Sequence, residues 1–178
     1  MSENSLLMKR AAALIARRAH SRGELRRKLA DGLKAQKAQN SENLEATDEI
    51  EVVLDRLEYL NLLNDAEYAY NFAFYHLKDL GWGEDKVREA LLNRDVAKAA
   101  AEQAIDRVRE EIAPDGTNGA LMEYVESYCR KHGNPSSLKE AQKLARHLAG
   151  RGFDENGIID ALQRVISPEI FRHFVTGD

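Results

Sequence analysis

One five-residue pattern occurs three times in the chain, as Val53-Leu-Asp-Arg-Leu57, Ala104-Ile-Asp-Arg-Val108 and Ala161-Leu-Gln-Arg-Val165. In each copy the first, second and fifth positions are apolar, which is the spacing of one face of an α-helix. An apolar pair four residues apart precedes each copy, as Leu25/Leu29, Val87/Leu91 and Leu144/Leu148. The interval from Leu91 to Val108 is 17 residues, and so is the interval from Leu148 to Val165. Equal spacing of this kind indicates an internal repeat.

The first copy departs from this spacing, because Leu29 and Leu57 are 28 residues apart, 11 more than in the other two. The extra residues fall in a stretch of Lys, Gln, Asn, Ser and Glu over about residues 34–46, which predicts a polar insertion. We therefore predict three three-helix repeats, at 1–62 with the insertion, at 63–112, and at 113–178 with a short C-terminal tail.

The composition predicts an all-α fold. Ala, Leu, Glu, Arg and Lys dominate, only 3 Pro and 11 Gly are present, and runs rich in Val, Ile and Thr are missing. Ser21-Arg-Gly-Glu24 and Ser137-Leu-Lys-Glu140 are capping boxes that predict helix starts, and Thr47 is the expected cap of the third helix. A single three-helix unit is too small to bury its apolar face well, so we expect the three tandem repeats to form an elongated, curved stack.

Several classes of function are disfavoured by what the sequence lacks. It has no P-loop, dinucleotide fingerprint, paired-histidine metal motif or nucleophile elbow, and its five His are dispersed. We expect no enzyme, no metal and no cofactor, with His76 a packed helix residue. Cys129 is the only cysteine, which excludes an intrachain disulfide and is typical of a small apolar residue in a reducing cytosol. No segment has the length and hydrophobicity of a membrane span, so a cytoplasmic protein is expected.

Charge is distributed unevenly along the chain. The net charge is −4, made up of +7 in residues 1–40, −10 in residues 41–112 and −1 in residues 113–178. The candidate binding residues are the cations of the basic arm, namely Arg10, Arg17, Arg18, Arg22, Arg26, Arg27 and Lys28. Such a cluster suits phosphates or an acidic protein surface, but it is equally consistent with a solvated face that balances the acidic middle.

Two further sets leave alternatives open. The arginine shared by the three patterns (Arg56, Arg107, Arg164) is either a repeated surface site or, more often in such helices, a solvated or locally paired residue. The aromatic residues of the central region suit a protein interface or packing between repeats; they are Tyr68, Tyr70, Phe72, Phe74, Tyr75 and Trp82.

Three runs of the sequence together are characteristic: Ala16-Arg-Arg-Ala-His-Ser21-Arg-Gly-Glu24-Leu25-Arg-Arg-Lys-Leu29, then Val53 to Ala69 with Asn64-Asp65 within it, and Arg151-Gly-Phe153 with Ile158 and Ala161-Leu162. These runs resemble the RecX family of bacterial RecA regulators. The resemblance spans nearly the whole chain. It implies three tandem three-helix repeats, no catalytic residues, and binding to the RecA filament on single-stranded DNA with suppression of its ATPase and strand exchange.

The chain departs from the family in three respects. Residues 34–46 stand where a short turn is usual, Arg88-Glu-Ala-Leu91-Leu-Asn-Arg-Asp95 lacks the usual basic residue–Gly turn, and the chain is more acidic than a protein lying near DNA. We expect a monomer whose basic arm contacts DNA phosphate, weakly, or an acidic RecA surface. The alternatives are a stand-alone DNA-binding regulator of helix-turn-helix type and a scaffold for an unrelated protein.

Overall fold

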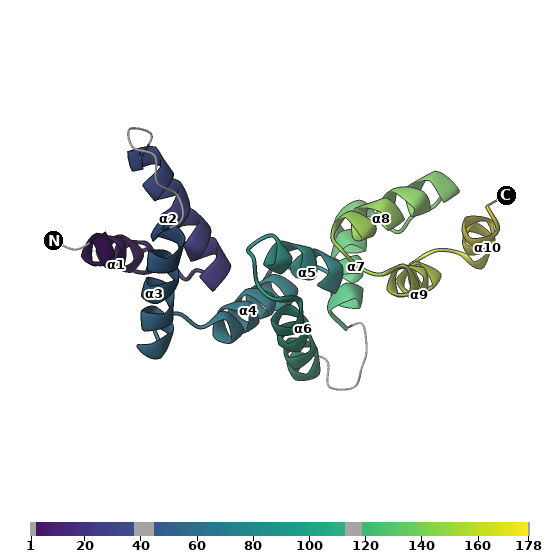
Figure 1. Cartoon of the computed structure of the whole chain (residues 1–178). Helices are drawn as coiled ribbons and strands as arrows, with labels where there is room; N and C mark the ends of the chain where they lie inside the picture. Colours follow the sequence, from purple (N-terminus) through teal and green to yellow (C-terminus); the bar gives the residue numbers. More distant parts are fainter. Residues whose placement is uncertain (1–2, 38–44, 113–118, 178) are drawn as a thin grey trace. The chain divides into compact units, whose positions relative to one another are not determined.

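The computed structural model describes residues 3–37, 45–112 and 119–177, and within these ranges it contains helices and no strand (Figure 1). The all-α prediction is confirmed. The helices in chain order are α1 (Glu3–Ile15), α2 (Arg22–Lys37), α3 (Glu45–Tyr59), α4 (Asp65–Phe74) with a π-helical turn (Tyr75–Asp79), α5 (Glu84–Leu92), α6 (Lys98–Ile112), α7 (Gly119–His132), α8 (Leu138–Gly150), α9 (Glu155–Val165) and α10 (Pro168–Thr176).

The chain divides into two compact units. The N-terminal unit comprises Met1–Asn71 and Leu91–Ala101, and the C-terminal unit comprises Phe72–Ala90 and Glu102–Asp178. Helices α4, α5 and α6 contribute residues to both units. The boundaries 1–62, 63–112 and 113–178 of three separate repeats stay a prediction.

In the N-terminal unit, α1, α2 and α3 pack on one another around a leucine-rich core (Figure 1). Its fully buried members include Leu7 and Ala11 of α1, Leu25 and Leu29 of α2, and Val53, Leu54 and Leu57 of α3. Each helix contributes apolar residues three or four positions apart, which is why one face of each is covered.

The core of the C-terminal unit repeats this arrangement with α7, α8 and α9. It buries Leu121 and Val125, Leu144 and Leu148, and Ala161 and Leu162. The predicted C-terminal tail is a nine-residue helix, α10, with Pro168 in its first turn. Ser167 caps it by accepting a hydrogen bond from the Ile170 amide, and Phe171 and Phe174 pack against the core.

The burial of the five-residue pattern agrees among its three copies. The first two positions are buried, and the third and fourth are exposed, in each copy. The fifth position is buried in Leu57 and Val108 and half-buried in Val165. The apolar pairs of α2, α5 and α8 are also buried, which confirms the helical faces predicted from the spacing, while Arg56, Arg107 and Arg164 are exposed.

One expected helix boundary is wrong. Helix α3 begins at Glu45, so Thr47 lies inside the helix and not at its cap. Helix α2 runs to Lys37, so both edges of the predicted 34–46 insertion are helical, and its residues 38–44 lie outside the described ranges. Ala35, Gln36 and Lys37, like Glu45 and Ala46, are good helix formers, so helix propagates past the end of the apolar pattern.

Both capping boxes form their first hydrogen bond. The Ser21 hydroxyl accepts from the Glu24 amide at 3.0 Å, and the Ser137 hydroxyl accepts from the Glu140 amide at 3.3 Å. The two carboxylates bind elsewhere, that of Glu24 to the side chains of Arg18 and Lys28 and that of Glu140 to the amide and hydroxyl of Ser136.

The backbone at Gly83 lies very close to the backbone of Arg151 and Gly152 in the C-terminal unit. Its amide donates to the Arg151 carbonyl at 2.8 Å, and a Cβ at Gly83 would lie 1.9 Å from the carbonyl oxygen of Gly152. We predict that Gly83→Ala lowers the free energy of unfolding by about 1–3 kcal/mol or more, because the backbone must move to admit the methyl group. Urea denaturation followed by circular dichroism measures this change.

The matched control is Gly150→Ala at the end of α8, where nothing lies within 4 Å of an added Cβ. Its stability should stay the same or rise by up to about 1 kcal/mol, because alanine is the better helix former. Equal stability of the two variants would contradict the close approach.

Candidate nucleic-acid or protein interface

The seven candidate cations all lie in the N-terminal unit, on α1, on α2 and in the turn between them. Arg10 is on α1, Arg17 and Arg18 follow it, and Arg22, Arg26, Arg27 and Lys28 are on α2. Five of them are bound by carboxylates of the same unit and three line a groove, with Lys28 in both groups.

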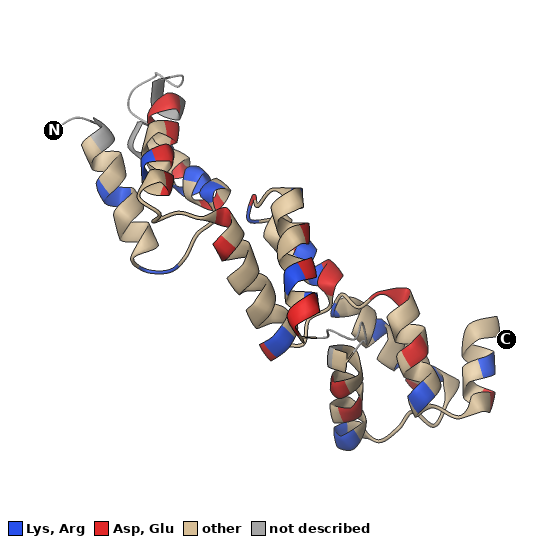
Figure 2. Cartoon of the chain, turned by 90° about the horizontal axis from the view of Figure 1, so that it is seen from below, with Lys and Arg blue, Asp and Glu red and all other residues tan. Residues whose placement is uncertain are grey.

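Arg22 and Arg26 join α2 to α3. The Arg22 guanidinium donates to Glu51 at 2.7 Å and to Asp55 at 2.6 Å, and it also binds Glu58. Arg26 donates to both carboxylate oxygens of Glu51. Blue and red segments consequently lie side by side on these helices (Figure 2). For these two arginines the acidic middle of the sequence supplies intramolecular partners.

This network shifts the pKa of Glu51 and the pKa of Arg22. Hydrogen bonds from Arg26 and then Arg22 outweigh the opposing effect of burial and lower the pKa of Glu51 to about 2. Burial disfavours the charge on Arg22, but the hydrogen bonds that Arg22 donates to Glu51 and Asp55 outweigh this effect, and the pKa of Arg22 is raised. Glu51 and Arg22 therefore remain charged across the neutral range.

Three other cations are also paired. Arg27 forms an ion pair with Asp95 at 2.8 Å, and the buried Glu24 side chain binds Arg18 and, at 3.5 Å, Lys28. Lys28 is also 3.1 Å from Nε2 of the buried His20, whose Nδ1 donates to the Arg18 carbonyl. Burial lowers the pKa of His20, so its neutral ring accepts from Lys28 and fixes the direction of that side chain.

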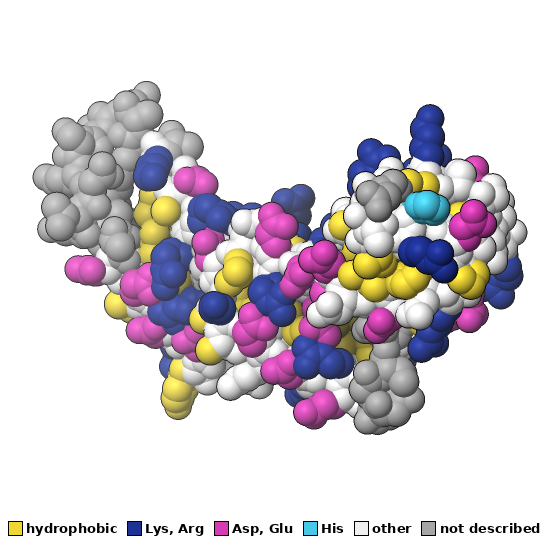
Figure 3. Space-filling model, turned by 90° about the vertical axis from the view of Figure 1, so that its right-hand side faces the viewer, with side chains coloured by type: hydrophobic (Ala, Val, Ile, Leu, Met, Phe, Trp, Pro, Cys, Tyr) yellow, Lys and Arg dark blue, Asp and Glu magenta, His cyan; other side chains and the backbone are white. Residues whose placement is uncertain are grey.

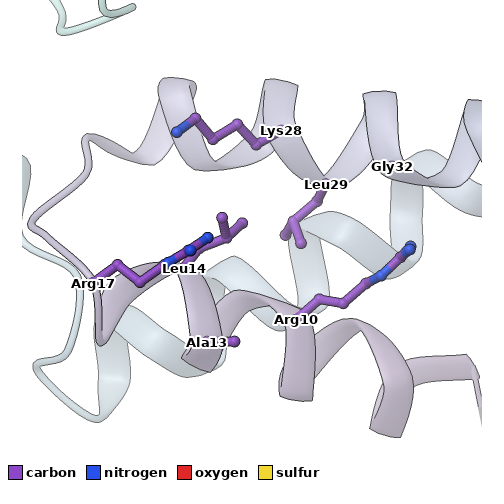
Figure 4. A pocket seen from close by; sticks show the side chains of 7 residues that line it. All are labelled: Arg10, Ala13, Leu14, Arg17, Lys28, Leu29 and Gly32. Carbon is purple, nitrogen blue, oxygen red and sulfur yellow. The ribbon is translucent and has the colours of Figure 1, made fainter.

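A groove of about 440 Å³ lies between α1 and α2. Three of the candidate cations line it, Arg10 and Arg17 from the α1 side and Lys28 from α2 (Figure 4). Its other lining residues are Ala13, Leu14, Leu29 and Gly32. The Arg10 side chain passes close to Gly32. A Cβ added at Gly32 would lie 3.3 Å from Nη1 of Arg10. Positive side chains around an apolar floor suit a phosphate group carrying an apolar or aromatic substituent.

Sequence reasoning missed two parts of this region. The carboxylates that bind Arg22 and Arg26 were not identified, although Glu51, Asp55 and Glu58 follow the four- and three-residue spacing of one helix face. Of the floor residues of the groove, sequence reasoning named Leu29 only as part of a buried apolar pair. Glycine at position 32 was the available clue, since it removes a side chain from the middle of α2.

Comparison with known proteins identifies the family. The chain is 32% identical over 157 residues to regulatory protein RecX of Ectopseudomonas mendocina, which covers 86% of this chain and 91% of that protein. It is 33% identical over 158 residues to regulatory protein RecX of Pseudomonas putida, covering 88% and 86% of the two chains. The chain belongs to the RecX family.

A crystal structure of RecX from Lactobacillus salivarius has the same fold, with a TM-score of 0.69, 18% identity, and coverage of 91% of this chain and 96% of that one. A second crystal structure of regulatory protein RecX gives a TM-score of 0.65. No family model matches the sequence. The resemblance stated from the sequence runs is thus confirmed, and the relatives are named as regulatory proteins.

His76 and Cys129 both have packing roles. His76 stacks on Phe72 with ring centroids 3.8 Å apart, lies against Trp82, and donates from Nδ1 to the Phe72 carbonyl, as expected of a packed residue. Cys129 is buried, which raises the pKa of its thiol. Within the described ranges no helix is long and apolar enough to cross a membrane, and no cluster of three metal-ligating side chains is found.

The lowered pKa of Glu51 predicts a pH-dependent contribution to stability. Since its folded-state pKa of about 2 lies below the ordinary value of 4.5, the stabilisation is present above pH 4.5 and is lost as the pH falls toward 2. Glu51→Gln should lower the free energy of unfolding by on the order of 1 kcal/mol at pH 7, after allowance for solvent screening. The deficit should shrink progressively below pH 4.5 in urea titrations.

Glu126→Gln provides the control, because Glu126 is exposed on α7 in the other unit. Its effect on stability should be small at every pH. A Glu51→Gln deficit that is the same at pH 3 as at pH 7 would rule out the network as the source of the stabilisation.

Proposed function

We propose that this RecX protein regulates RecA by binding the RecA filament on single-stranded DNA and inhibiting its ATPase, recombinase and co-protease activities. The observation that carries the proposal is 30–33% identity to proteins named regulatory protein RecX over 86–93% of the chain. The N-terminal run from Ala16 to Leu29 that resembles the family also contains most of the candidate cations. The protein then affects DNA repair and recombination without chemistry of its own.

The α1–α2 groove is the part of the molecule best suited to the DNA of the filament. Arg17 is exposed at its edge, and Lys28 is oriented by His20 and Glu24. Phosphate contacts of this kind supply affinity without reading the base sequence. A regulator that must bind the filament on any DNA sequence needs contacts of this type.

A helix-turn-helix regulator is less well supported, although α1 and α2 are joined by a short turn. A recognition helix presents free polar side chains to base edges. On α2 the side chains of Arg22 and Arg26 bind carboxylates of α3, and Arg27 binds Asp95. Releasing them to DNA would expose Glu51 and its neighbours to the phosphates.

We also propose where the protein acts and in what form. It works as a monomer in the cytoplasm, as a binding protein and not as an enzyme, and it needs no cofactor. Its relatives carry the name of a regulatory protein, which is consistent with action through binding alone.

Addition of the protein to RecA assembled on single-stranded DNA is expected to inhibit ATP hydrolysis. Inhibition should reach its limit at or below one regulator per RecA subunit. A coupled ATPase assay measures this, with binding to duplex DNA in the absence of RecA as the comparison. Sequence-selective duplex binding with no effect on RecA would favour the helix-turn-helix alternative.

Charge reversal in the groove should weaken filament binding. The double variant Arg10→Glu/Arg17→Glu is expected to lower the affinity and to reduce the slope of log K against log salt by about 1–2, as for the loss of two phosphate contacts. The matched control is Lys139→Glu/Lys143→Glu, two exposed lysines on α8. If both double variants bind alike over a salt series, the groove does not contact phosphate.

A further inference from the structure

A second groove, of about 820 Å³, lies in the C-terminal unit between α8, the start of α9 and α10. It is chemically unlike the α1–α2 groove. Its lining residues are Asp85, Ala145, Arg146, Ala149, Phe153, Asp154, Glu155, Ile158, Ile159, Phe174 and Val175. We call it the α8–α10 groove.

The floor of the α8–α10 groove is apolar and open. Ala145 and Ala149 are one helical turn apart on α8 and leave that side of the helix without bulky side chains. Phe153 and Phe174 are only half-buried, and Val175 is 58% exposed. Figure 3 shows hydrophobic side chains gathered between charged ones on the C-terminal side of the molecule. Exposed apolar surface in a groove with a polar rim is typical of a binding site.

The rim of the groove has an acidic balance. Three of its lining residues are carboxylates (Asp85, Asp154, Glu155), and one is an arginine, Arg146. Asp85 is paired with Arg88, and Asp154 accepts a hydrogen bond from the Gly157 amide as the cap of α9. Glu155 is exposed beside them. Because Arg88 neutralises Asp85, two carboxylates face one arginine, and this small acidic excess favours lysine and arginine over phosphate.

We infer that the α8–α10 groove is the protein-binding surface of this chain, and that it holds an amphipathic, basic-flanked segment of a RecA subunit. The assignment of RecA as the owner of that segment rests on the proposed function. Apolar side chains of the segment cover Phe174, Val175 and the alanines of α8, and its cations meet the carboxylates of the rim. Binding of an amphipathic segment in an apolar groove follows a common mode of peptide recognition.

The two grooves thus make two different kinds of contact. The α1–α2 groove presents cations to a polyanion, whereas the α8–α10 groove presents an apolar floor and carboxylates to a protein. Substitutions in the second groove should therefore weaken binding to the RecA filament and leave binding to bare single-stranded DNA unchanged.

The test uses the full chain with Ala149→Glu and, separately, Val175→Glu. Both residues are exposed, so the substitutions place a charge in the groove without disturbing the core. Val52→Glu on α3 is the matched control, since Val52 is 57% exposed and Val175 is 58% exposed. Cosedimentation with RecA–DNA filaments measures binding, ATP hydrolysis measures inhibition, and fluorescence anisotropy with oligo-dT measures binding to DNA alone.

We expect each groove variant to need about tenfold more protein for half-saturation of the filament, as for removal of a central interface contact. Val52→Glu should match the unmodified protein. Glu155→Gln should weaken filament binding at low salt more than at high salt, because it removes one attractive charge.

The outcomes separate this inference from the proposed function. If the unmodified protein does not cosediment with filaments, both are overturned. If it cosediments and the groove variants bind as Val52→Glu does, the proposed function stands and the α8–α10 groove is excluded as the contact. If the groove variants lose affinity for oligo-dT to the same extent as for filaments, the occupant is nucleic acid and the inference is wrong.

Discussion

The structure depends on the burial of apolar residues that recur at four-residue spacing on successive short helices. In the N-terminal unit, Leu25 and Leu29 of α2 meet Leu54 and Leu57 of α3, and all four are almost inaccessible to water. Fully burying one leucine contributes about 1.5–3 kcal/mol, whereas a helix of 13–16 residues is marginal in isolation. The helices therefore fold by packing in groups, and their outer faces remain available for charge.

Those outer faces do not all serve binding. The acidic stripe of α3 binds Arg22 and Arg26 of α2, so the contact between these helices is partly apolar and partly ionic. These two arginines already have carboxylate partners within the unit. The candidate cations thus serve two purposes: Arg22 and Arg26 join α2 to α3, and Arg10, Arg17 and Lys28 line a groove whose chemistry suits a phosphate.

How much of the structure the sequence predicts depends on how far apart in the sequence the interacting residues lie. Helical faces were predicted correctly, because the spacing of Val53, Leu54 and Leu57 is a local property of one helix. The Thr47 cap was predicted wrongly, because good helix formers extend a helix beyond its apolar stripe. The ion pairs of Arg22 and the α8–α10 groove join segments far apart in sequence, and no local pattern specifies which carboxylate meets which arginine.

A filament of protein on DNA presents two surfaces of opposite chemistry, and one regulator that contacts both must keep its own complementary surfaces apart. Asp154 and Glu155 repel a polyanion, and Arg10 and Arg17 repel a basic segment, so each groove suits only one of these ligands. The two grooves lie in different parts of the sequence, with the excess of cations in residues 1–40 and the apolar groove in α8–α10. The copies of the five-residue pattern share their buried positions, and the residues around them differ. The three copies of the five-residue pattern therefore keep the fold, and the residues around them determine what each part of the molecule binds.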